Sequence, residues 1–439
     1  MRIKRRIDPT PLLIGLALQL LAATSGTAQI VALDPGQTID DPRSGWLPYA
    51  FATESMGTAV GAAAFASGKF RQPISSLIGT AFYSSNDSWS VVGSQTNIKL
   101  PWTQRLFIDS YLLLGHFTDS RFYIDLDKDP NEPKAGSNES NPDDFVTGIS
   151  NDVRIELTFK YALPIGNARE DPVSVYHLNR GLLESGPVGA ERWNPSKTGK
   201  TTVSVRLFGR YQDLDEETQS ELLAARTNGL EFVLDYDNTD FPRNPSRGSR
   251  QKGIVTRDWG WFNSSDSWTN LELGLSKYFD LGTSGWFRQQ VLAFNYWTSN
   301  TPTWTPSAEN PHIVTSRPPP HMGSTLGGMD RLRAYPSGRF NDKSAVYYTA
   351  ELRFLPRTRA LRDLPVFKYF EVDWFQIVPF VEAGRVGPNY NEELYFDDLR
   401  VTAGIDLRLM AYRNVVRVGY AWSEEGGQVW AMIGQPFAR

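Results

Sequence analysis

The stretch DVRIELTFKY (residues 152–161) decides the fold, because polar and apolar side chains alternate strictly along it. The apolar set is Val153, Ile155, Leu157, Phe159 and Tyr161. The polar set is Asp152, Arg154, Glu156, Thr158 and Lys160. A period of two indicates a β-strand with one apolar and one polar face. In a soluble sandwich the polar face would meet bulk water, whereas in a membrane barrel it would line the interior and the apolar face would touch lipid.

The composition permits a membrane barrel and excludes a bundle of transmembrane helices. Hydrophobic residues make up 40% of the 439 residues, and the mean hydropathy is −0.38, whereas transmembrane helices need repeated apolar runs of ~20 residues. Aromatic residues reach 13%, a surplus that aromatic girdles at the two membrane interfaces would use. The net charge of −4, with no Lys/Arg-rich run after residue 6, indicates no nucleic-acid partner. The absence of cysteine excludes disulfides and Cys-based metal sites.

The N-terminus predicts export. MRIKRR (residues 1–6) is a cationic region, LLIGLALQLLAA (12–23) is an apolar region, and GTA (26–28) is a small-x-small cleavage site. We therefore expect residues 1–28 to be a signal peptide that is removed after Ala28. The alternative is an uncleaved anchor, for which the apolar run is short. Because no later segment is apolar enough for a membrane helix, the chain would enter a membrane as strands.

The alternation recurs in runs of ~10 residues, the length that a tilted strand needs to cross a bilayer. We predict sixteen strands, near residues 47–55, 57–68, 74–85, 88–99, 105–117, 151–163, 201–213, 229–238, 249–259, 267–279, 286–298, 344–355, 372–385, 397–410, 414–422 and 428–437. A soluble sandwich would rarely need so many strands of this length behind an export signal. The sequence therefore predicts an all-β protein: a short periplasmic leader (29–46) followed by an outer-membrane barrel (47–439) with a charged, wet lumen.

The connections are of two kinds. One set is mostly tight, and the other includes the long polar loops 118–150, 214–228 and 299–343. Short periplasmic turns and longer outer loops are usual for membrane barrels. Residues 164–200 do not fit, because they form a long connection on the predicted periplasmic side; the pattern suggests for them only a small plug or docking element.

Residues 326–354, LGGMDRLRAYPSGRFNDKSAVYYTAELRF, resemble the sixth outer loop and twelfth strand of BamA/TamA-type outer-membrane proteins, the bacterial surface antigen barrel superfamily. That loop carries an Arg-Gly-aromatic motif, matched here by Leu332, Arg333, Ala334 and Tyr335. LDYDNTDFPRNPSRG (234–248) and VPFVEAGRVG (378–387) are similar to further family segments. The resemblance covers most of the barrel and implies a 16-stranded antiparallel transmembrane β-barrel whose long sixth outer loop folds inward.

The resemblance also implies a contact between loop and barrel. In the family the loop arginine meets an aromatic-x-acid pair on the thirteenth strand, which places Arg333 against Phe380 and Glu382. The residues support this, because Phe380 and Glu382 lie two positions apart and share one face of their strand. A guanidinium held by a carboxylate makes a charge-assisted contact, and the ring could add a cation–π term of order 1 kcal/mol. With Tyr335, these residues form the expected clamp; the alternative is that Arg333 is an exposed loop charge.

The chain departs from the family pattern in several places. Ala334 replaces the motif glycine, and Glu382 stands where Asp is common. The last strand is expected to end near Phe437, which would act as the terminal aromatic recognised during barrel assembly, although GQPFAR continues past it. Insertases of the family carry periplasmic POTRA domains, and this sequence is interpreted as a single barrel without them.

The sequence offers little support for an enzymatic site or a metal site. Some outer-membrane barrels are phospholipases with a Ser-His pair, but His116 has no serine in an obvious partner motif. Asp125, Asp127 and Asp129 have calcium-loop spacing, yet Pro130 and Gly136 occupy positions where a calcium hand needs Gly and Glu. We therefore expect no enzymatic activity, no cofactor and no metal site.

The sequence is compatible with three functions. The family implies a role in inserting or translocating protein or lipid at the outer membrane of a Gram-negative bacterium. The alternatives are a passive ion or solute pore and a structural surface barrel. The expected partners are outer-membrane lipid and lipopolysaccharide, the barrel assembly machinery during biogenesis and client polypeptides. A weak seam between the first and last strands would be the physical basis of the first function, because Gly426, Gly427, Gly434 and Pro436 pair poorly.

Overall fold

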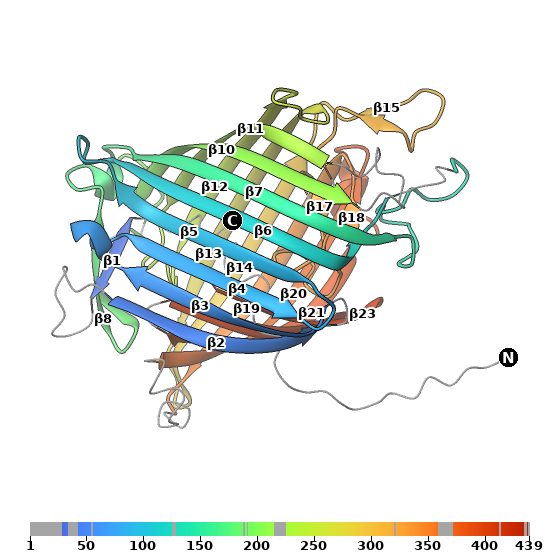
Figure 1. Ribbon diagram of the computed structural model, residues 1–439. Coiled ribbons are helices and arrows are strands. Elements are labelled where there is room, and N and C mark those ends of the chain that lie inside the picture. Colours follow the sequence, from blue (N-terminus) through green and yellow to red (C-terminus); the bar gives the residue numbers. More distant parts are fainter. Residues whose placement is uncertain are drawn as a thin grey trace.

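A single antiparallel sheet of sixteen strands dominates the computed structural model and rolls around an interior (Figure 1). The structure describes residues 29–33, 43–53, 56–124, 129–187, 189–190, 192–214, 225–319, 322–358, 372–411, 414–433 and 437. The expected signal peptide lies outside these ranges. The strands of the sheet, in chain order, are β2 (Arg43–Thr53), β3 (Gly57–Ser67), β4 (Ser76–Ser84), β5 (Trp89–Lys99), β6 (Leu106–Phe122), β7 (Val146–Ala162), β10 (Lys200–Leu214), β11 (Ala225–Asp237), β12 (Gly248–Trp259), β13 (Ser267–Gly282), β14 (Phe287–Asn300), β19 (Ser344–Pro356), β20 (Val372–Gly387), β21 (Arg400–Ala411), β22 (Asn414–Ser423) and β23 (Gly426–Ile433).

Each of the sixteen predicted strands coincides with one of these, so the predicted all-β fold of sixteen antiparallel strands is confirmed. Several strand boundaries differ from the prediction by a few residues. The barrel boundary expected at residue 47 lies within β2, which begins at Arg43. β6 and β7 run on to Phe122 and back from Val146, so the loop between them is shorter than expected. A register shift between Phe117 and Ser120 explains the longer β6 and β7, because a bulge breaks the period of two on which the prediction depends.

The remaining elements lie outside the large sheet. A three-stranded sheet contains β1 (Ile30–Leu33), β8 (Ser174–Asn179) and β9 (Leu182–Ser185). Two short hairpins belong to the connection between β14 and β19: β15 (Thr305–Pro306) with β16 (Val314–Thr315), and β17 (Thr325–Leu326) with β18 (Phe340–Asn341). The helical elements among the described residues are short: α2 (Glu392–Phe396) and the 3₁₀ turns η2 (Lys69–Arg71) and η3 (Gly166–Ala168). Within the described ranges, no helix is long and apolar enough to cross a membrane.

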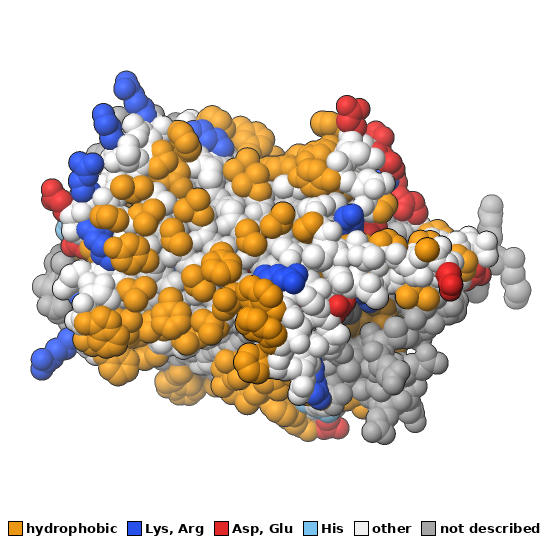
Figure 2. Space-filling model, turned by 90° about the horizontal axis from the view of Figure 1, so that it is seen from above, with side chains coloured by type: hydrophobic (Ala, Val, Ile, Leu, Met, Phe, Trp, Pro, Cys, Tyr) orange, Lys and Arg blue, Asp and Glu red, His pale blue; other side chains and the backbone are white. Residues whose placement is uncertain are grey.

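The two faces of the sheet have the polarity that the alternation predicts. On β7, Ile155 is 56% exposed, whereas Glu156 and Thr158 are 7% exposed. Figure 2 shows the resulting flank of the molecule, a broad band of hydrophobic side chains with most charged side chains toward its two ends. Exposed aromatic side chains lie near both ends, among them Trp46, Phe70, Trp102, Trp286, Tyr83, Trp89, Trp261, Phe262, Tyr420 and Trp422. This is the girdle arrangement of a membrane barrel.

Inward-facing charges are paired across neighbouring strands. Arg210 on β10 donates to both carboxylate oxygens of Asp152 on β7, at 3.0 and 2.7 Å. Lys160 on β7 lies 2.6 Å from Asp109 on β6. Pairing satisfies these charges inside the barrel, where an unpaired ion would be costly.

The two ends of the barrel differ, and we call them the outer and inner mouths. The outer mouth carries the connections 123–145 and 301–343, including β15, β17 and β18; the inner mouth carries β1 and β8 (Figure 1). The long connection between β7 and β10, which the sequence pattern left without a defined structure, forms β8 and β9 at the inner mouth. We call the sheet of β1, β8 and β9 the inner plug.

The opposed faces of β12 give a direct test of which side meets lipid. Val255 is 42% exposed on the outward face, and Thr256 is 4% exposed beside a lumenal cavity that Glu231 and Glu272 also line. In lipid vesicles, Val255→Lys is expected to lower the free energy of unfolding by about 2–4 kcal/mol, because it buries an ammonium in hydrocarbon. Thr256→Lys should cost clearly less, since its ammonium faces two carboxylates. Denaturant titration of both variants measures the difference, and equal losses would contradict the assignment of faces.

Candidate functional site

The long loop, residues 301–343 between β14 and β19, carries the predicted motif into the barrel. Arg333 is 2% exposed and Tyr335 is 1% exposed, so the alternative of an exposed loop charge is wrong. Leu332 precedes Arg333 with φ 51°, a left-handed conformation that is strained for a leucine. Its side chain is fully buried in a cluster with Leu326, Tyr335 and Phe340, and this packing holds the turn that aims Arg333 at the barrel wall.

Arg333 contacts three strands of the wall at once. Its Nε donates to Glu382 Oε1 on β20 at 2.6 Å, and its backbone N–H donates to Glu382 Oε2 at 2.7 Å. Nη1 donates to Asp406 Oδ2 on β21 at 3.1 Å, and Nη2 lies 3.4 Å from Glu351 Oε1 on β19. Burial alone would lower the pKa of the guanidinium, but Glu382 and Asp406 raise it above its ordinary value, so Arg333 stays charged.

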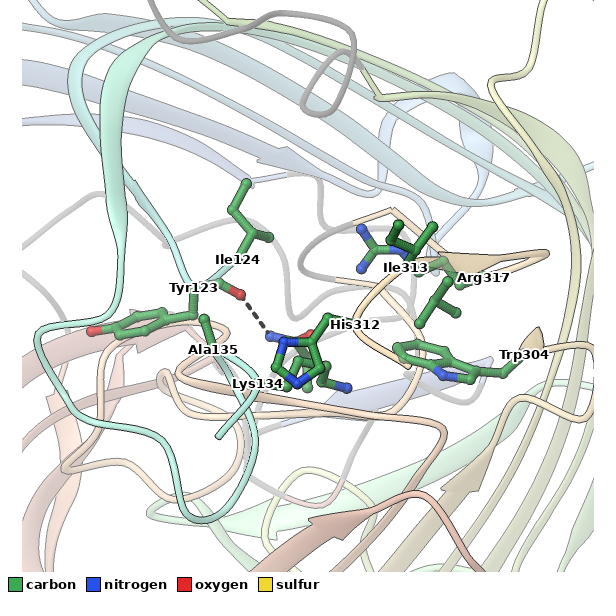
Figure 3. Close-up of a pocket in the computed structure, with 10 residues that line it drawn as sticks. Tyr123, Ile124, Lys134, Ala135, Trp304, His312, Ile313 and Arg317 are labelled. Carbon is green, nitrogen blue, oxygen red and sulfur yellow. Dashed lines mark hydrogen bonds between the residues drawn. The ribbon is translucent and has the colours of Figure 1, made fainter. Parts of the chain in front are cut away.

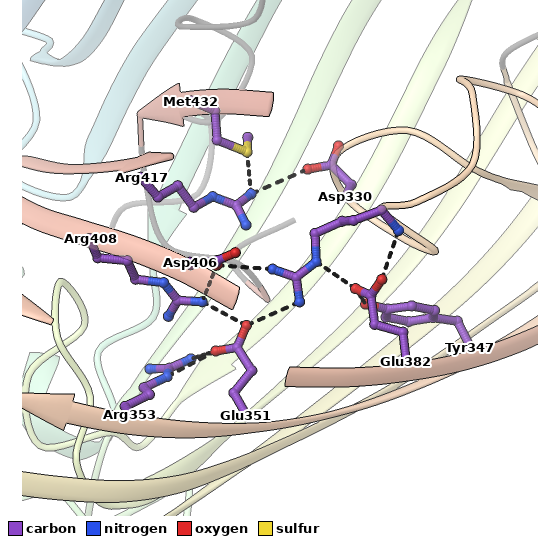
Figure 4. Close-up of polar contacts among 10 residues, drawn as sticks. Asp330, Tyr347, Glu351, Arg353, Glu382, Asp406, Arg408, Arg417 and Met432 are labelled. Carbon is purple, nitrogen blue, oxygen red and sulfur yellow. Dashed lines mark hydrogen bonds and ion pairs between the residues drawn. The ribbon is translucent and has the colours of Figure 1, made fainter. Parts of the chain in front are cut away.

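These carboxylates belong to a larger group that we call the lumenal charge cluster, shown in Figure 4. Its members are Arg333, Glu351, Arg353, Glu382, Asp406, Arg408 and Arg417, all at most 2% exposed. Arg408 donates to Glu351 at 2.7 Å and to Asp406 at 2.9 Å, while Arg353 donates to Glu351 at 3.0 Å. Arg417 contacts the thioether of Met432 and lies 4.0 Å from Asp330. Arg333, Arg353 and Arg408 share three carboxylates, and Arg417 adds a fourth buried cation, so the cluster tolerates the loss of an acid poorly.

The aromatic partner of the predicted clamp is also in place. The guanidinium carbon of Arg333 lies 3.5 Å from the ring centroid of Phe380, close enough for a cation–π contact. The Phe380 ring packs against Gly404 on β21. A side chain at position 404 would collide with the ring, because its Cβ would lie 2.3 Å from Phe380 Cζ. Ala334, which replaces the motif glycine, packs its methyl group against Phe380 and Trp430. The structure thus brings together Arg333, Phe380 and Glu382.

Two other predicted site residues lie elsewhere. Tyr335 packs edge-on against Phe340 inside the loop's own apolar cluster, with ring centroids 5.0 Å apart, and none of its described contacts is to Glu382. β23 is described as far as Ile433, and Phe437, the next described residue, lies in a turn. Its ring packs against Tyr278 on β13 and lies 5.4 Å from the guanidinium carbon of Arg353. Its role as an assembly signal stays a prediction.

A second arginine ties the outer loops together, and the sequence pattern did not identify it. Arg339 is fully buried and donates to both carboxylate oxygens of Glu425, at 2.8 and 2.9 Å, in the turn between β22 and β23. It also donates to the hydroxyl and carbonyl oxygens of Ser140, at 2.8 and 2.7 Å, in the loop between β6 and β7. The fold brings Arg339 and Ser140 together from distant parts of the chain, and no local periodicity in the sequence identifies either residue.

A small pocket of about 70 Å³ lies where the two long outer loops meet (Figure 3). The amide of Asn341 donates to the carbonyl of Tyr123 at 3.1 Å, and the backbone N–H of Asn341 donates to Gly136 at 2.7 Å. The ammonium of Lys134 lies 4.9 Å from the Trp304 ring centroid and 3.1 Å from Asp342. These contacts pack one loop over the other and cover the outer mouth.

The wall opposite the clamp borders a larger cavity of about 200 Å³. It is polar: Arg206 lies 3.2 Å from Glu231, Arg154 donates to Glu156 at 2.6 Å, and the guanidinium of Arg331 stacks 3.6 Å from the Trp297 ring centroid. The long loop therefore leaves a hydrophilic space beside β7, β10, β11, β12 and β13.

The residues weighed for other chemistry have ordinary surroundings. His116 Nδ1 lies 2.8 Å from Asn151 Oδ1, and the ring stacks near Trp89. Asp129 accepts hydrogen bonds from the backbone and side chain of Asn131, which lower the pKa of its carboxyl group. Asp125 and Asp127 lie outside the described residues.

The clamp can be tested by a double-mutant cycle. Arg333→Ala and Glu382→Ala are each expected to lower the free energy of unfolding by about 3–5 kcal/mol, because each leaves a buried charge without its partner. Arg333→Ala should be the more harmful, since three carboxylates lose a shared cation. The double variant should cost little more than Arg333→Ala. Heat-dependent gel mobility of the folded barrel measures these losses, and fully additive losses would show that the two side chains act separately.

Two solved structures are similar to this chain. The fold matches CdiB from Escherichia coli, with 10% identity and a TM-score of 0.54, over 88% of this chain and 61% of that one. It also matches BamA from Haemophilus ducreyi lacking POTRA domains 1–3, with 13% identity and a TM-score of 0.49, over 90% of this chain and 70% of that one. The chain thus spans less than two thirds of the CdiB chain. No curated protein sequence matches it.

The family assignment rests on the sequence of the barrel itself. The model of the Omp85 superfamily domain matches residues 188–429, more than half of the 439 residues. This range contains the long loop with Arg333 and the strands that carry Glu351, Glu382 and Asp406. The chain belongs to the Omp85 superfamily.

Proposed function

We propose that this protein inserts or translocates polypeptide or lipid at the outer membrane, without catalysing a covalent reaction. Omp85 barrels are outer-membrane proteins of Gram-negative bacteria. The observation that carries the proposal is the seam of the sheet. β2 and β23 stand at the two ends of the strand order, and no backbone ladder joins them over the described residues. Strand edges with unpaired backbone groups can pair with another chain.

The clamp supports this proposal because it stiffens one side of the seam. Arg333 connects β19, β20 and β21, and Ala334 packs near Trp430 and Met432 on the inward face of β23. Over the described residues, β23 is also the shortest strand of the large sheet, with eight residues. A rigid wall that ends in a short edge strand allows the seam to separate while the rest of the barrel stays intact.

A passive pore is the second candidate, favoured by the polar cavity of about 200 Å³. The elements that lie at the two mouths argue against a passive pore. The two long outer loops pack together over the outer mouth, and the inner plug lies at the other. A pore would need at least one of these covers to move.

The experiment that separates the candidates locks the seam. The chain has no cysteine, so one cysteine in β2 and one in β23 can be screened as pairs that form a disulfide on oxidation. In proteoliposomes, the reduced protein should accelerate the folding of an unfolded outer-membrane barrel added from outside. The oxidised pair should lose this acceleration and regain it on reduction. A cysteine pair within the hydrogen-bonded strands β10 and β11 is the matched control and should have no effect.

Planar bilayers provide the opposing outcome. Steady, ion-selective conductance without any acceleration of folding would replace the proposal with the pore. Neither acceleration nor conductance would indicate a structural barrel.

A further inference from the structure

The two ends of the barrel carry opposite charge. Figure 2 shows lysine and arginine side chains gathered at its left end, where Figure 1 has β1 and β8, and most acidic side chains at the opposite end. The turn between β3 and β4 and the turn between β5 and β6 belong to the basic end, because Ile74 and Phe107 beside them pack against the inner plug. We call residues 68–75 and 99–105 the two basic turns.

The two basic turns contain no acidic residue. They read GKFRQPIS (68–75) and KLPWTQR (99–105). Among the described residues, no carboxylate pairs with Lys69, Arg71 or Lys99. Elsewhere in this barrel, inward cations are matched by acids on neighbouring strands, as Lys160 is by Asp109. The charge of the basic turns is therefore left for an anion from outside the chain.

Hydrogen bonds hold the two basic turns side by side. Gln72 Nε2 donates to the carbonyl of Lys99 at 3.1 Å, and the backbone N–H of Lys99 donates to Gln72 Oε1 at 2.6 Å. Within the first turn, Ser75 Oγ donates to the carbonyl of Lys69 at 3.0 Å. The side-chain amide of Gln72 thus joins the backbones of the two turns, and their cations form one preorganised group.

Exposed aromatic side chains are interleaved with these cations. Phe70 is 69% exposed and Trp102 is 78% exposed, and Trp46, near the inner end of the adjoining strand β2, is 64% exposed. Phe70 and Arg71 have φ values of 59° and 55°, left-handed conformations that are uncommon for residues with a side chain. Backbone strain of this kind clusters at functional sites. Rings beside cations suit the membrane interface, where the ring enters the headgroup layer and the cation meets phosphate.

We infer that the two basic turns form a binding site for the headgroup of an anionic phospholipid in the inner leaflet. The lipid phosphate would lie among Lys69, Arg71 and Lys99, while the rings of Phe70 and Trp102 would enter the boundary between headgroups and acyl chains. A zwitterionic headgroup fits less well, because its ammonium would need a carboxylate and the turns have none. Binding would fix the depth of the inner ends of β3 to β6 in the bilayer. The inference does not depend on the proposed function.

A fluorophore beside the site reports which lipid occupies it. The chain has no cysteine, so Pro101→Cys, at an exposed position next to Trp102, provides a single labelling position. The labelled protein is placed in phosphatidylcholine vesicles that contain an equal small fraction of brominated phosphatidylglycerol or brominated phosphatidylcholine. The brominated anionic lipid should quench the label several-fold more strongly. High salt should reduce the difference, because salt screens exposed charges.

Two triple variants separate the site from the net charge of the inner end. Replacing Lys69, Arg71 and Lys99 with Gln should make the two brominated lipids quench equally. The matched control removes the same charge from exposed positions elsewhere at the inner end, by replacing with Gln the residues Arg180, Lys197 and Arg247. The control should keep the preference for the anionic lipid. Heat-dependent gel mobility verifies that both variants fold, and equal loss of the preference in both would overturn the site.

The aromatic residues provide a second measurement. Phe70→Ser combined with Trp102→Ser should weaken quenching by both brominated lipids, because the turns would no longer enter the interface. Unchanged quenching in this variant, or a wild-type label that neither lipid quenches, would contradict a membrane-facing site. Binding of polyglutamate that the first triple variant loses, without any lipid preference in the wild type, would assign the basic turns to an acidic polypeptide and overturn the lipid proposal.

Discussion

The backbone of a strand in hydrocarbon has no water to accept its hydrogen bonds, so every N–H and C=O must find a partner within the protein. Sixteen strands that pair in chain order satisfy this constraint between all neighbouring strands of the sheet. The outward face then has to be apolar, and Ile155 and Leu157 meet that requirement on β7. The same constraint makes the two end strands, β2 and β23, the place where the structure is least secure.

The polar half of each strand faces a space that the protein fills rather than leaves open. The long loop enters from the outer mouth, and Arg333 joins three strands through Glu351, Glu382 and Asp406. Buried ion pairs give little net stability, but removing one partner is costly. Such a cluster therefore holds the loop in one arrangement. Because the inner plug lies at the opposite mouth, the seam is the part of the barrel that the proposed function needs to move.

Much of this structure was predictable, and for identifiable reasons. A period of two is a local property, so DVRIELTFKY reveals its own two faces, and the family motif placed Arg333 on Phe380 and Glu382. Contacts between segments that are distant in the chain produce no local sequence pattern. Ile30 pairs with Ser174, and Arg339 binds Ser140 and Glu425, although no sequence pattern near these residues predicts these contacts. Phe437 was expected at the end of the last strand, whereas its ring packs against Tyr278 on β13, a contact that no local pattern predicts.

The central claim is that lipid bathes one face of this sheet while the other face encloses a wet interior. Nitroxide labels on single cysteines at consecutive positions of β7, from Ile155 to Thr158, test it most directly in the membrane-embedded protein. Labels at positions 155 and 157 should be accessible to oxygen dissolved in lipid, and those at 156 and 158 should not. Accessibility without this alternation, or water-soluble relaxation agents reaching positions 155 and 157, would contradict the account.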